Sequence, residues 1–514
     1  MLGNFALDAK DVAQVEWDIA GKNRAARKLE RFADGLERRL LERTGDGKNH
    51  RLQAQTLFED ALHVLAVILF LLDALTVRVD IGIAGDADQS AVERLIGAKA
   101  TVQAGKNDVL EQDVGVGAGG RGNVYAQYAE KYPGSLQIVG VSDINEFRRK
   151  RMSDRFSVKE SCRLGDWSEV FKKPKFADIV FITTPDRLHY APCMKALEMG
   201  YHVLLEKPAA QTEKECTDIL KQSQKYNRIV AICHVLRYAP YFKALKETVD
   251  SGKIGELVSI QHLEPIERIH FSHSYVRGNW NNSKKSTPAV ISKSCHDLDI
   301  LRWIVGKPCK EVTAFGDLSY FKASKAPQKA AKRCLDCPIE RECAFSAKRI
   351  YYEKHTWLYV FDLSGDKQQR DEQILSYLRT SDYGRCVFHS DNDQPDHFIM
   401  NMKFEDGVTA AFSMEALTSY GGRRTRIMGT KGDVVGDMQT FTVTDFLTGK
   451  QEKWGTDIND GHGGGDLRLI RDLLWAVDKK DESLLTSSIA ASIESHVMGF
   501  RGEQSRLKGT IEKL

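Results

Sequence analysis

A glycine-rich turn is the first stretch of this sequence whose residue types and spacing could do chemistry. Residues 117 to 122 read G-A-G-G-R-G and fit the pattern G-x-G-x-x-G, after a short apolar run and before a helix-compatible segment. One glycine permits a tight bend, another lets the backbone approach a pyrophosphate, and another lets helix pack on strand. The N–H groups of the helix N-terminus attract anions. We therefore expect cofactor contacts from Gly117, Gly119, Gly120, Arg121 and Gly122.

A carboxylate follows these glycines at the spacing that nicotinamide dinucleotides require. Asp143 ends the apolar run 136–141 and lies about twenty residues past the turn, where it could accept the ribose hydroxyls of NAD. It would repel the 2′-phosphate of NADP, and Asn145 leaves no cation immediately beside it, although Arg148 and Arg149 are near. The sequence therefore predicts NAD in preference to NADP. The alternative is an ordinary strand–turn–helix unit with a capping aspartate.

A group of cysteines could bind a metal. Cys334, Cys337 and Cys343 form a C-x₂-C-x₅-C cluster, and Cys386 could supply a fourth thiolate. Four thiolates suit a structural, tetrahedral zinc ion. Free thiols in a surface excursion are the alternative.

The secondary-structure elements that would position these residues follow two different patterns along the chain. From Val114 the sequence alternates strand-like and helix-like segments, which indicates an α/β fold with a Rossmann-type, doubly wound parallel sheet. After Tyr238 longer alternating strands appear, and they favour an open, mostly antiparallel sheet within a C-terminal α/β domain. These strands are expected at 257–263, 311–320, 397–404, 408–416 and 425–428, with closing helices at 466–477 and 487–501.

Three regions follow from this division. Residues 1–112 form an N-terminal extension of unknown nature, either a gene-model artefact or an extra domain. Residues 113–237 form the dinucleotide-binding domain, whose first strand looks clipped because polar residues precede Val114. Residues 238–514 form a substrate and oligomerisation domain with a Cys-rich insertion near 322–396.

Composition excludes several other classes of protein. The formal charge of +3 and the lack of a long basic run argue against nucleic-acid binding. The longest apolar run, 64–72, is too short to span a bilayer, so no membrane partner is expected. Ten cysteines without a secretory signal favour reduced thiols and a cytoplasmic location.

Several short sequence motifs occur in an order that resembles one enzyme family. They are Thr184-Pro-Asp-Arg-Leu-His189, Glu206-Lys-Pro208, Arg237-Tyr238, Gly252-Lys-Ile-Gly255 and Cys295-His-Asp-Leu-Asp299. Together they resemble the Gfo/Idh/MocA oxidoreductases, from about Val114 to Leu514. The resemblance implies a bound nicotinamide cofactor, carbohydrate substrates and a homo-oligomer formed through the open sheet. It also adds Thr184, Pro185, His189, Glu206 and Lys207 to the expected cofactor site.

The resemblance assigns the catalytic roles to Lys207 and His296. Oxidising a secondary alcohol needs a base for the hydroxyl proton, and a histidine suits that task near neutral pH. Lys207 ends a strand at the carboxyl edge of the sheet, where its ammonium could stabilise a developing alkoxide. Asp297 and Asp299 could orient His296 or hold the following helix. A core histidine and a solvated lysine are the alternatives.

The sequence departs from the family where many members carry an aspartate four residues before the histidine. Here Ser292 stands there, followed by Lys293, which could bind an acidic or strongly polar substrate or could face solvent. The segment 270–286 resembles a sugar-binding lip, although an ordinary surface loop is the alternative. Expected substrate contacts are Lys293, Trp280, Arg237 and His462.

We therefore predict an NAD-dependent oxidoreductase that moves a hydride between nicotinamide and a secondary hydroxyl of a sugar, polyol or sugar derivative. The first alternative is an NAD-dependent glycoside-cleaving enzyme that works by oxidation, elimination and re-reduction. The second alternative is a catalytically silent NAD(H)-binding regulator.

Overall fold

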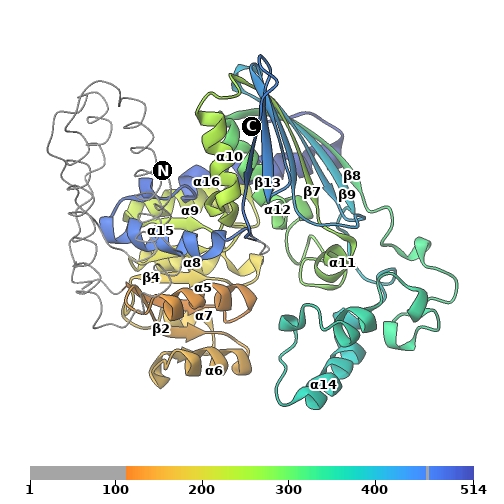
Figure 1. Ribbon diagram of the computed structural model, residues 1–514. Helices are drawn as coiled ribbons and strands as arrows, with labels where there is room; N and C mark the ends of the chain where they lie inside the picture. The colour runs from red at the N-terminus through yellow and green to blue at the C-terminus, as the bar shows by residue number, and fades with distance from the viewer. Residues whose placement is uncertain (1–110, 459–461) are drawn as a thin grey trace, which may run out of the picture. The chain divides into compact units, whose positions relative to one another are not determined.

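The first sheet has six parallel strands with the glycine-rich turn at its centre. The computed structural model describes residues 111–458 and 462–514. The strand order is β3-β2-β1-β4-β5-β6, and every pairing in this sheet is parallel (Figure 1). The strands are β1 (Glu111–Val116), β2 (Leu136–Ser142), β3 (Arg163–Leu164), β4 (Ile179–Ile182), β5 (His202–Leu205) and β6 (Val230–Ile232). This arrangement confirms the predicted Rossmann-type sheet.

Strand β1 is not clipped, which corrects the expectation from its polar start. It has six residues, and its polar first half pairs with Leu136–Ile138 of β2, with a register shift between Asp113 and Val114. Asp113 is buried, and burial raises the pKa of its carboxyl well above the usual range. The full length of this strand was not predicted from the sequence, because polar residues such as a buried aspartate are rare in a central strand. The expected extension 1–112 otherwise lies outside the described residues.

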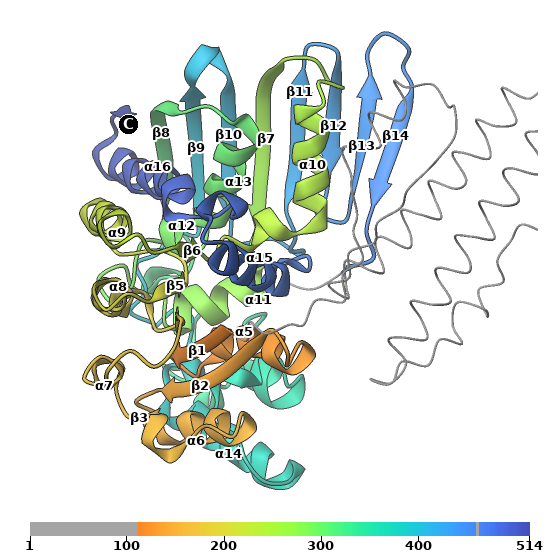
Figure 2. The same ribbon diagram turned by 90° about the vertical axis from the view of Figure 1, so that its left-hand side faces the viewer.

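Helices cover both faces of this sheet, and apolar residues are buried on each side of it (Figures 1 and 2). The helix α9 begins with the predicted capping box between Thr212 and Glu215. The helices are α5 (Gly120–Lys131), α6 (Glu146–Arg155), α7 (Trp167–Val170), α8 (Tyr190–Glu198) and α9 (Glu213–Tyr226).

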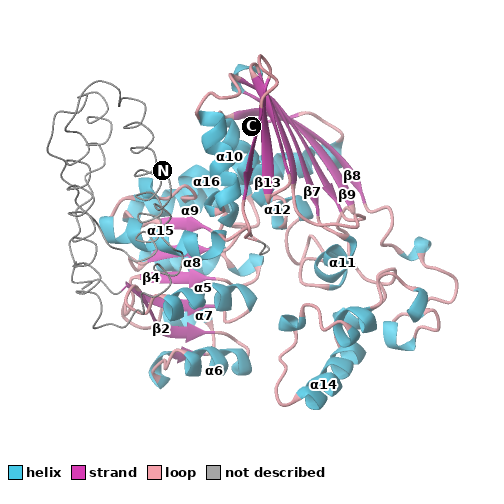
Figure 3. Cartoon of the chain, in the orientation of Figure 1, coloured by secondary structure: helices cyan, strands magenta, loops and turns pink. Residues whose placement is uncertain are grey.

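The second sheet has nine strands in the order β14-β13-β12-β11-β7-β10-β9-β8-β15. Its pairings are antiparallel except for β7 with β10, so the sheet is mostly antiparallel, as predicted. Figure 3 shows the strands of this sheet in magenta. Strands 7 to 15 are β7 (Leu257–Pro265), β8 (Cys309–Asp317), β9 (His397–Phe404), β10 (Thr409–Glu415), β11 (Arg424–Gly429), β12 (Gly432–Gly436), β13 (Thr440–Asp445), β14 (Gln451–Gly455) and β15 (Glu512–Lys513).

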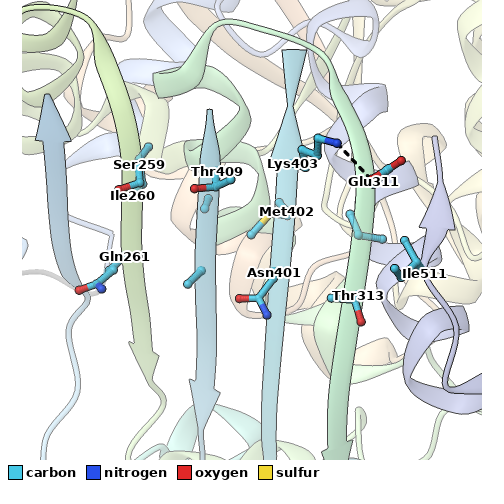
Figure 4. A pocket seen from close by; sticks show the side chains of 13 residues that line it. Ser259, Ile260, Gln261, Glu311, Thr313, Asn401, Met402, Lys403, Thr409 and Ile511 are labelled. Atoms are coloured by element: carbon cyan, nitrogen blue, oxygen red, sulfur yellow. Dashed lines mark ion pairs between the residues drawn. The ribbon is translucent and has the colours of Figure 1, made fainter. Parts of the chain in front are cut away.

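One face of this sheet is buried and the other is open. Buried and exposed residues alternate along β9, as expected for a sheet covered on one side. Helices α10 (Pro240–Asp250), α13 (Cys295–Val305) and α16 (Ile489–Lys508) cover the inner face (Figure 2). The open face holds a shallow hollow of about 450 Å³ beside the Lys403–Glu311 ion pair (Figure 4). None of the residues proposed for chemistry lines this hollow.

The last two long helices return to the first sheet. Helix α15 (Gly465–Lys479) packs on α5, and α16 contacts both α9 and β8. The backbone N–H of Ile232 in β6 donates to the carbonyl oxygen of Ser487 at 2.8 Å. The two sheets are therefore joined by more than the chain at residue 238.

The Cys-rich insertion forms a small unit beyond β8. It contains α14 (Lys367–Thr380) and a core of its own, with Tyr351, Phe361 and Leu378 among the buried side chains (Figure 1). Within residues 111–458 and 462–514, no helix has both the length and the apolar character needed to cross a membrane.

Candidate active site

The glycine-rich turn is tight where it must be and open where a ligand would approach. Gly117 has φ +103°, and a Cβ on Gly122 would lie 2.2 Å from the Gly117 carbonyl oxygen. A Cβ on Gly119 would meet nothing within 4 Å. Gly119 is also the N-cap of α5 and makes no side-chain cap. The turn therefore leaves room for an anionic group at the helix N-terminus.

Two side chains hold this turn in place. Asp143, at the end of β2, accepts the Ala118 N–H at 2.7 Å and the Asn145 N–H at 2.8 Å. Thr183, after β4, donates from Oγ1 to the Gly117 carbonyl oxygen at 2.7 Å. Asp143 thus lies beside the turn, where the spacing had put it. Thr183 was missed, because only its place after an apolar strand could have singled it out.

Arg121 and Glu206, both expected to contact the cofactor, are bound to each other. Arg121 Nε lies 2.7 Å from Glu206 Oε1, and the same guanidinium contacts Asp466 at 2.5 Å. His462 Nδ1 lies 3.0 Å from Asp466 Oδ2. Burial opposes ionisation of Asp466, but His462 and Arg121 outweigh it and lower the pKa of this carboxyl. These pairs join the first sheet to α15, and they bring His462 to the end of β5.

Lys207 and His296 lie near each other at this sheet edge. Lys207 Nζ donates to the Ser292 carbonyl oxygen at 2.8 Å, at the end of α12 (Ala289–Ser292). His296, in the first turn of α13, is buried, and neither ring nitrogen has a hydrogen-bond partner among the described residues. Burial lowers the pKa of His296 well below its usual range, and the Lys207 charge is the next cause.

Other histidines surround His296. Its ring centroid lies 5.7 Å from that of His462 and 6.0 Å from that of His234. Burial lowers the pKa of His234 to about 3. His234 follows β6, and its place after a buried strand is the signal that could have identified it.

The acids beside His296 hold helix α13 and do not contact the imidazole. Asp297 binds Arg423 at 2.7 Å and His262 at 3.0 Å. Asp299 accepts two hydrogen bonds of 2.7 Å from Arg237. Of the two roles expected for these acids, the structure supports the holding of the helix.

Arg237 and Trp280 are engaged within the protein. Arg237 is 3% exposed and also donates to the carbonyl oxygens of Thr486 and Ala491, so we leave it out of the proposed substrate site. Trp280 donates from Nε1 to Asp186 Oδ1 at 3.1 Å. Trp280 therefore ties the expected sugar-binding lip to the turn after β4.

Lys293 does not face solvent. Its Nζ lies 3.2 Å from Glu264 Oε1, and Glu264 Oε2 lies 3.0 Å from Arg423 Nε. Burial lowers the pKa of His270 well below its usual range, with the Lys293 charge as the next cause. Glu264 and Arg423 were not predicted, because they are distant in sequence and lie in no motif, whereas His270 opens the segment that was expected to form the sugar-binding lip.

His189 fixes the Thr184-Pro185 turn beside Lys207. Its Nδ1 lies 2.7 Å from the Pro208 carbonyl oxygen, and its Nε2 lies 2.8 Å from the Thr184 carbonyl oxygen. The ring therefore bridges the chain after β4 and the chain after β5. We assign it a positioning role within the expected cofactor site.

The insertion reaches this region too. The Trp357 ring centroid lies 4.3 Å from that of His273 and 5.1 Å from that of His270. A Cβ on Gly120 would lie 3.5 Å from the Tyr359 ring. These contacts place insertion residues beside both the glycine-rich turn and the histidines of the second sheet's domain.

The four cysteines of the predicted zinc site lie in the same part of the insertion. Burial raises the pKa of Cys343 and of Cys386, and Cys334 contributes to both shifts. Cys334 Sγ accepts the Ala347 N–H at 3.5 Å. Among residues 111–458 and 462–514, the structure shows no group of three or more His, Cys, Asp or Glu side chains already arranged around a metal position.

Comparisons with known proteins bear on the family and the fold. Profiles of the Gfo/Idh/MocA oxidoreductases match the chain twice: an NAD-binding Rossmann fold over residues 114–234 and a C-terminal alpha/beta domain over residues 246–494. The oxidoreductase YteT of Bacillus subtilis is 25% identical over 371 residues, which cover 68% of this chain and 84% of YteT.

An inositol 2-dehydrogenase of Salmonella typhimurium is 25% identical over 201 residues, 39% of this chain and 56% of that enzyme. Among solved structures, a levoglucosan dehydrogenase complexed with NADH has a TM-score of 0.60 at 15% identity. That likeness covers 79% of this chain and 99% of the dehydrogenase, and it bears on the fold alone.

Proposed function

Because the chain belongs to the Gfo/Idh/MocA oxidoreductase family, we propose that it transfers a hydride between NAD and a secondary hydroxyl of a sugar, polyol or sugar derivative. The observation that carries the proposal is a buried His296 whose ring nitrogens have no partner among the described residues and whose pKa is lowered further by the charge of Lys207. A buried imidazole without a partner is costly, so it favours a bound ligand group at that position.

The residues around the glycine-rich turn fit a dinucleotide. The open space at Gly119 and the uncapped N-terminus of α5 would receive the pyrophosphate. Asp143 would exchange a backbone partner for a ribose hydroxyl. When bound, the nicotinamide would accept or supply the hydride.

Lys207 and His296 then divide the work on the substrate hydroxyl. The Ser292 carbonyl oxygen holds the Lys207 ammonium, which stabilises negative charge on the substrate oxygen. Burial and the Lys207 charge keep His296 neutral, so its free nitrogen can take the hydroxyl proton. Lys293, whose ammonium pairs with Glu264, would offer its remaining N–H donors to a polar substituent of the substrate near His270.

A screen of polyols, sugars, sugar acids and glycosides tests this function. The purified full chain would be incubated with each compound and NAD, followed by NADH absorbance and product analysis. Formation of NADH and a ketone product with at least one compound is expected. Tight NAD binding with no turnover of any compound, and no effect of changing His296, would favour the silent regulator.

Redox-neutral glycoside cleavage is a second candidate, and the insertion favours it. Tyr359 lies against Gly120, so insertion residues border the dinucleotide site and would slow cofactor exchange. An enzyme that regenerates its cofactor each cycle needs no exchange. Release of free sugar from a synthetic glycoside without net NADH would identify this activity.

A structural zinc bound by Cys334, Cys337, Cys343 and Cys386 remains part of the proposal. Its support is that all four thiols lie in the insertion, where Cys334 contributes to the raised pKa of both Cys343 and Cys386. Metal analysis of gently purified protein tests it, and less than one zinc per two chains would remove it.

We also infer a homo-oligomer formed through the open face of the second sheet, and a reducing, cytoplasmic compartment. The first rests on outward apolar residues such as Phe315 and Ile399, which pair across β8 and β9. The second rests on the ten free cysteines.

A further inference from the structure

We propose that the insertion completes the dinucleotide site, and that Asp362 makes the enzyme select NAD over NADP by neutralising Arg148. This inference rests on the proposed function, because it assumes that the turn at Gly117–Gly122 binds a nicotinamide dinucleotide. It adds a selectivity residue from a segment far from the Rossmann motif in the sequence.

The contacts of Asp362 are specific. Its Oδ1 accepts a hydrogen bond from Arg148 Nε at 2.8 Å, and its Oδ2 accepts a hydrogen bond from Asn145 Nδ2 at 2.8 Å. Asn145 is the N-cap of α6, and its own Oδ1 accepts the Arg148 N–H at 3.1 Å. One carboxylate from the insertion therefore binds both residues that lie just beyond Asp143.

The charges at this position determine whether the site can accept the 2′-phosphate of NADP. In dinucleotide sites of this kind an acid after the second strand binds the ribose 2′-hydroxyl, whereas a nearby arginine accommodates the 2′-phosphate. Arg148 lies at this position, in the first turn of α6 just after Asp143 and Asn145. Burial opposes its charge, but Asp362 and then Asp143 outweigh that effect and raise the pKa of Arg148. With Asp362 bound, the charge of Arg148 is compensated, so a 2′-phosphate would gain no free cation from it.

The segment that carries Asp362 is held firmly enough to act in this way. Phe361 is buried in the core of the insertion, and Trp357 contacts His273. Trp357 has φ +53° although it is not glycine, a conformation that persists only where surrounding contacts impose it. Tyr359 lies between these anchors, 63% exposed, with its ring against Gly120.

The test compares binding of NADH and NADPH by fluorescence titration of the full chain. Asp362→Asn should raise the ratio of NADPH to NADH affinity by about tenfold or more, since one charge-assisted contact is removed from Arg148. Asp371→Asn is the matched control, because Asp371 is an insertion acid that pairs instead with His355 and Lys367. Its ratio should equal that of the wild type.

Arg148 gives a second, independent arm. Arg148→Ala alone should leave the ratio unchanged, because Asp362 already neutralises the guanidinium, and the double variant should lose the gain seen with Asp362→Asn. An unchanged ratio in folded Asp362→Asn, or a tenfold fall in Arg148→Ala, would overturn the inference. Wild-type protein that binds neither cofactor would instead refute the proposed function.

Discussion

The Lys207 ammonium donates a 2.8 Å hydrogen bond to the Ser292 carbonyl oxygen, and this bond links the domain of the first sheet to the domain of the second. Lys207 follows β5 of the first sheet, and Ser292 ends the short helix that precedes His296. Many members of the family carry an aspartate at the position of Ser292. In this chain the main-chain oxygen of that residue binds the lysine.

Lys207→Met and His296→Gln should each lower kcat by about a hundredfold or more, because each removes a group proposed to act on the substrate hydroxyl. NADH affinity should stay within about threefold of wild type. Lys214→Met is the control, since Lys214 is an exposed lysine paired with Asp218. Full activity in His296→Gln would remove the histidine from the mechanism.

The pH profile of kcat/KM should have its acid limb below pH 6.5. Burial and the Lys207 charge lower the pKa of His296, so the neutral, active base persists to more acidic pH than a free histidine would. Activity is therefore lost as pH falls through that lowered pKa. Residual activity in Lys207→Met should show the limb moved to higher pH, and a limb that stays in place would contradict the coupling.

Conformational stability should also fall in acid. Burial lowers the pKa of His202 to about 4 and of His273 to about 3, both below the unfolded value. Stability present above about pH 6.5 is lost toward pH 4, by about 1.4 kcal/mol per pH unit for each such histidine. Urea midpoints at pH 7.5 and pH 5 measure this slope. His202→Gln should flatten it, whereas a change at the exposed His389 should not.

Three alanine substitutions separate the folding role of the glycines from their binding role. Gly122→Ala should destabilise the protein by about 1–3 kcal/mol, because its Cβ would overlap the Gly117 carbonyl oxygen. Gly119→Ala should leave stability unchanged yet weaken NADH binding by about tenfold, because only a ligand would fill that space. Gly134→Ala, equally free of neighbours, should change neither. Unaltered binding in Gly119→Ala would argue against the proposed pyrophosphate position.

The open sheet gives a prediction about assembly. Ile399→Asp should reduce the oligomer to smaller species in sedimentation experiments, because a buried unpaired charge is costly at an interface. Leu447→Asp, the same kind of change at a 93% exposed turn residue, should not. A wild-type chain that sediments as a monomer would dismiss the interface.

The sequence predicted the Rossmann sheet and the mostly antiparallel second sheet, because strand ends and glycine spacing are local signals. It could not predict that Arg237 binds Asp299, or that Lys293 binds Glu264, because such partners are distant in sequence. It also misjudged β1, whose polar residues are paired within the sheet. Pairings between distant charges follow from the packing of elements, which one sequence does not reveal.

The return of the chain's end to β6 has a consequence for biosynthesis. The edge strand of the first sheet pairs with the segment at Ser487–Ser488, which leaves the ribosome hundreds of residues' worth of synthesis after β1 has emerged. Until then this edge presents open N–H and carbonyl groups, a known template for association between chains. During synthesis the Rossmann domain is therefore translated long before its edge strand β6 finds its partner at Ser487–Ser488. We expect the exposed strand edge to be a binding site for chaperones during that interval.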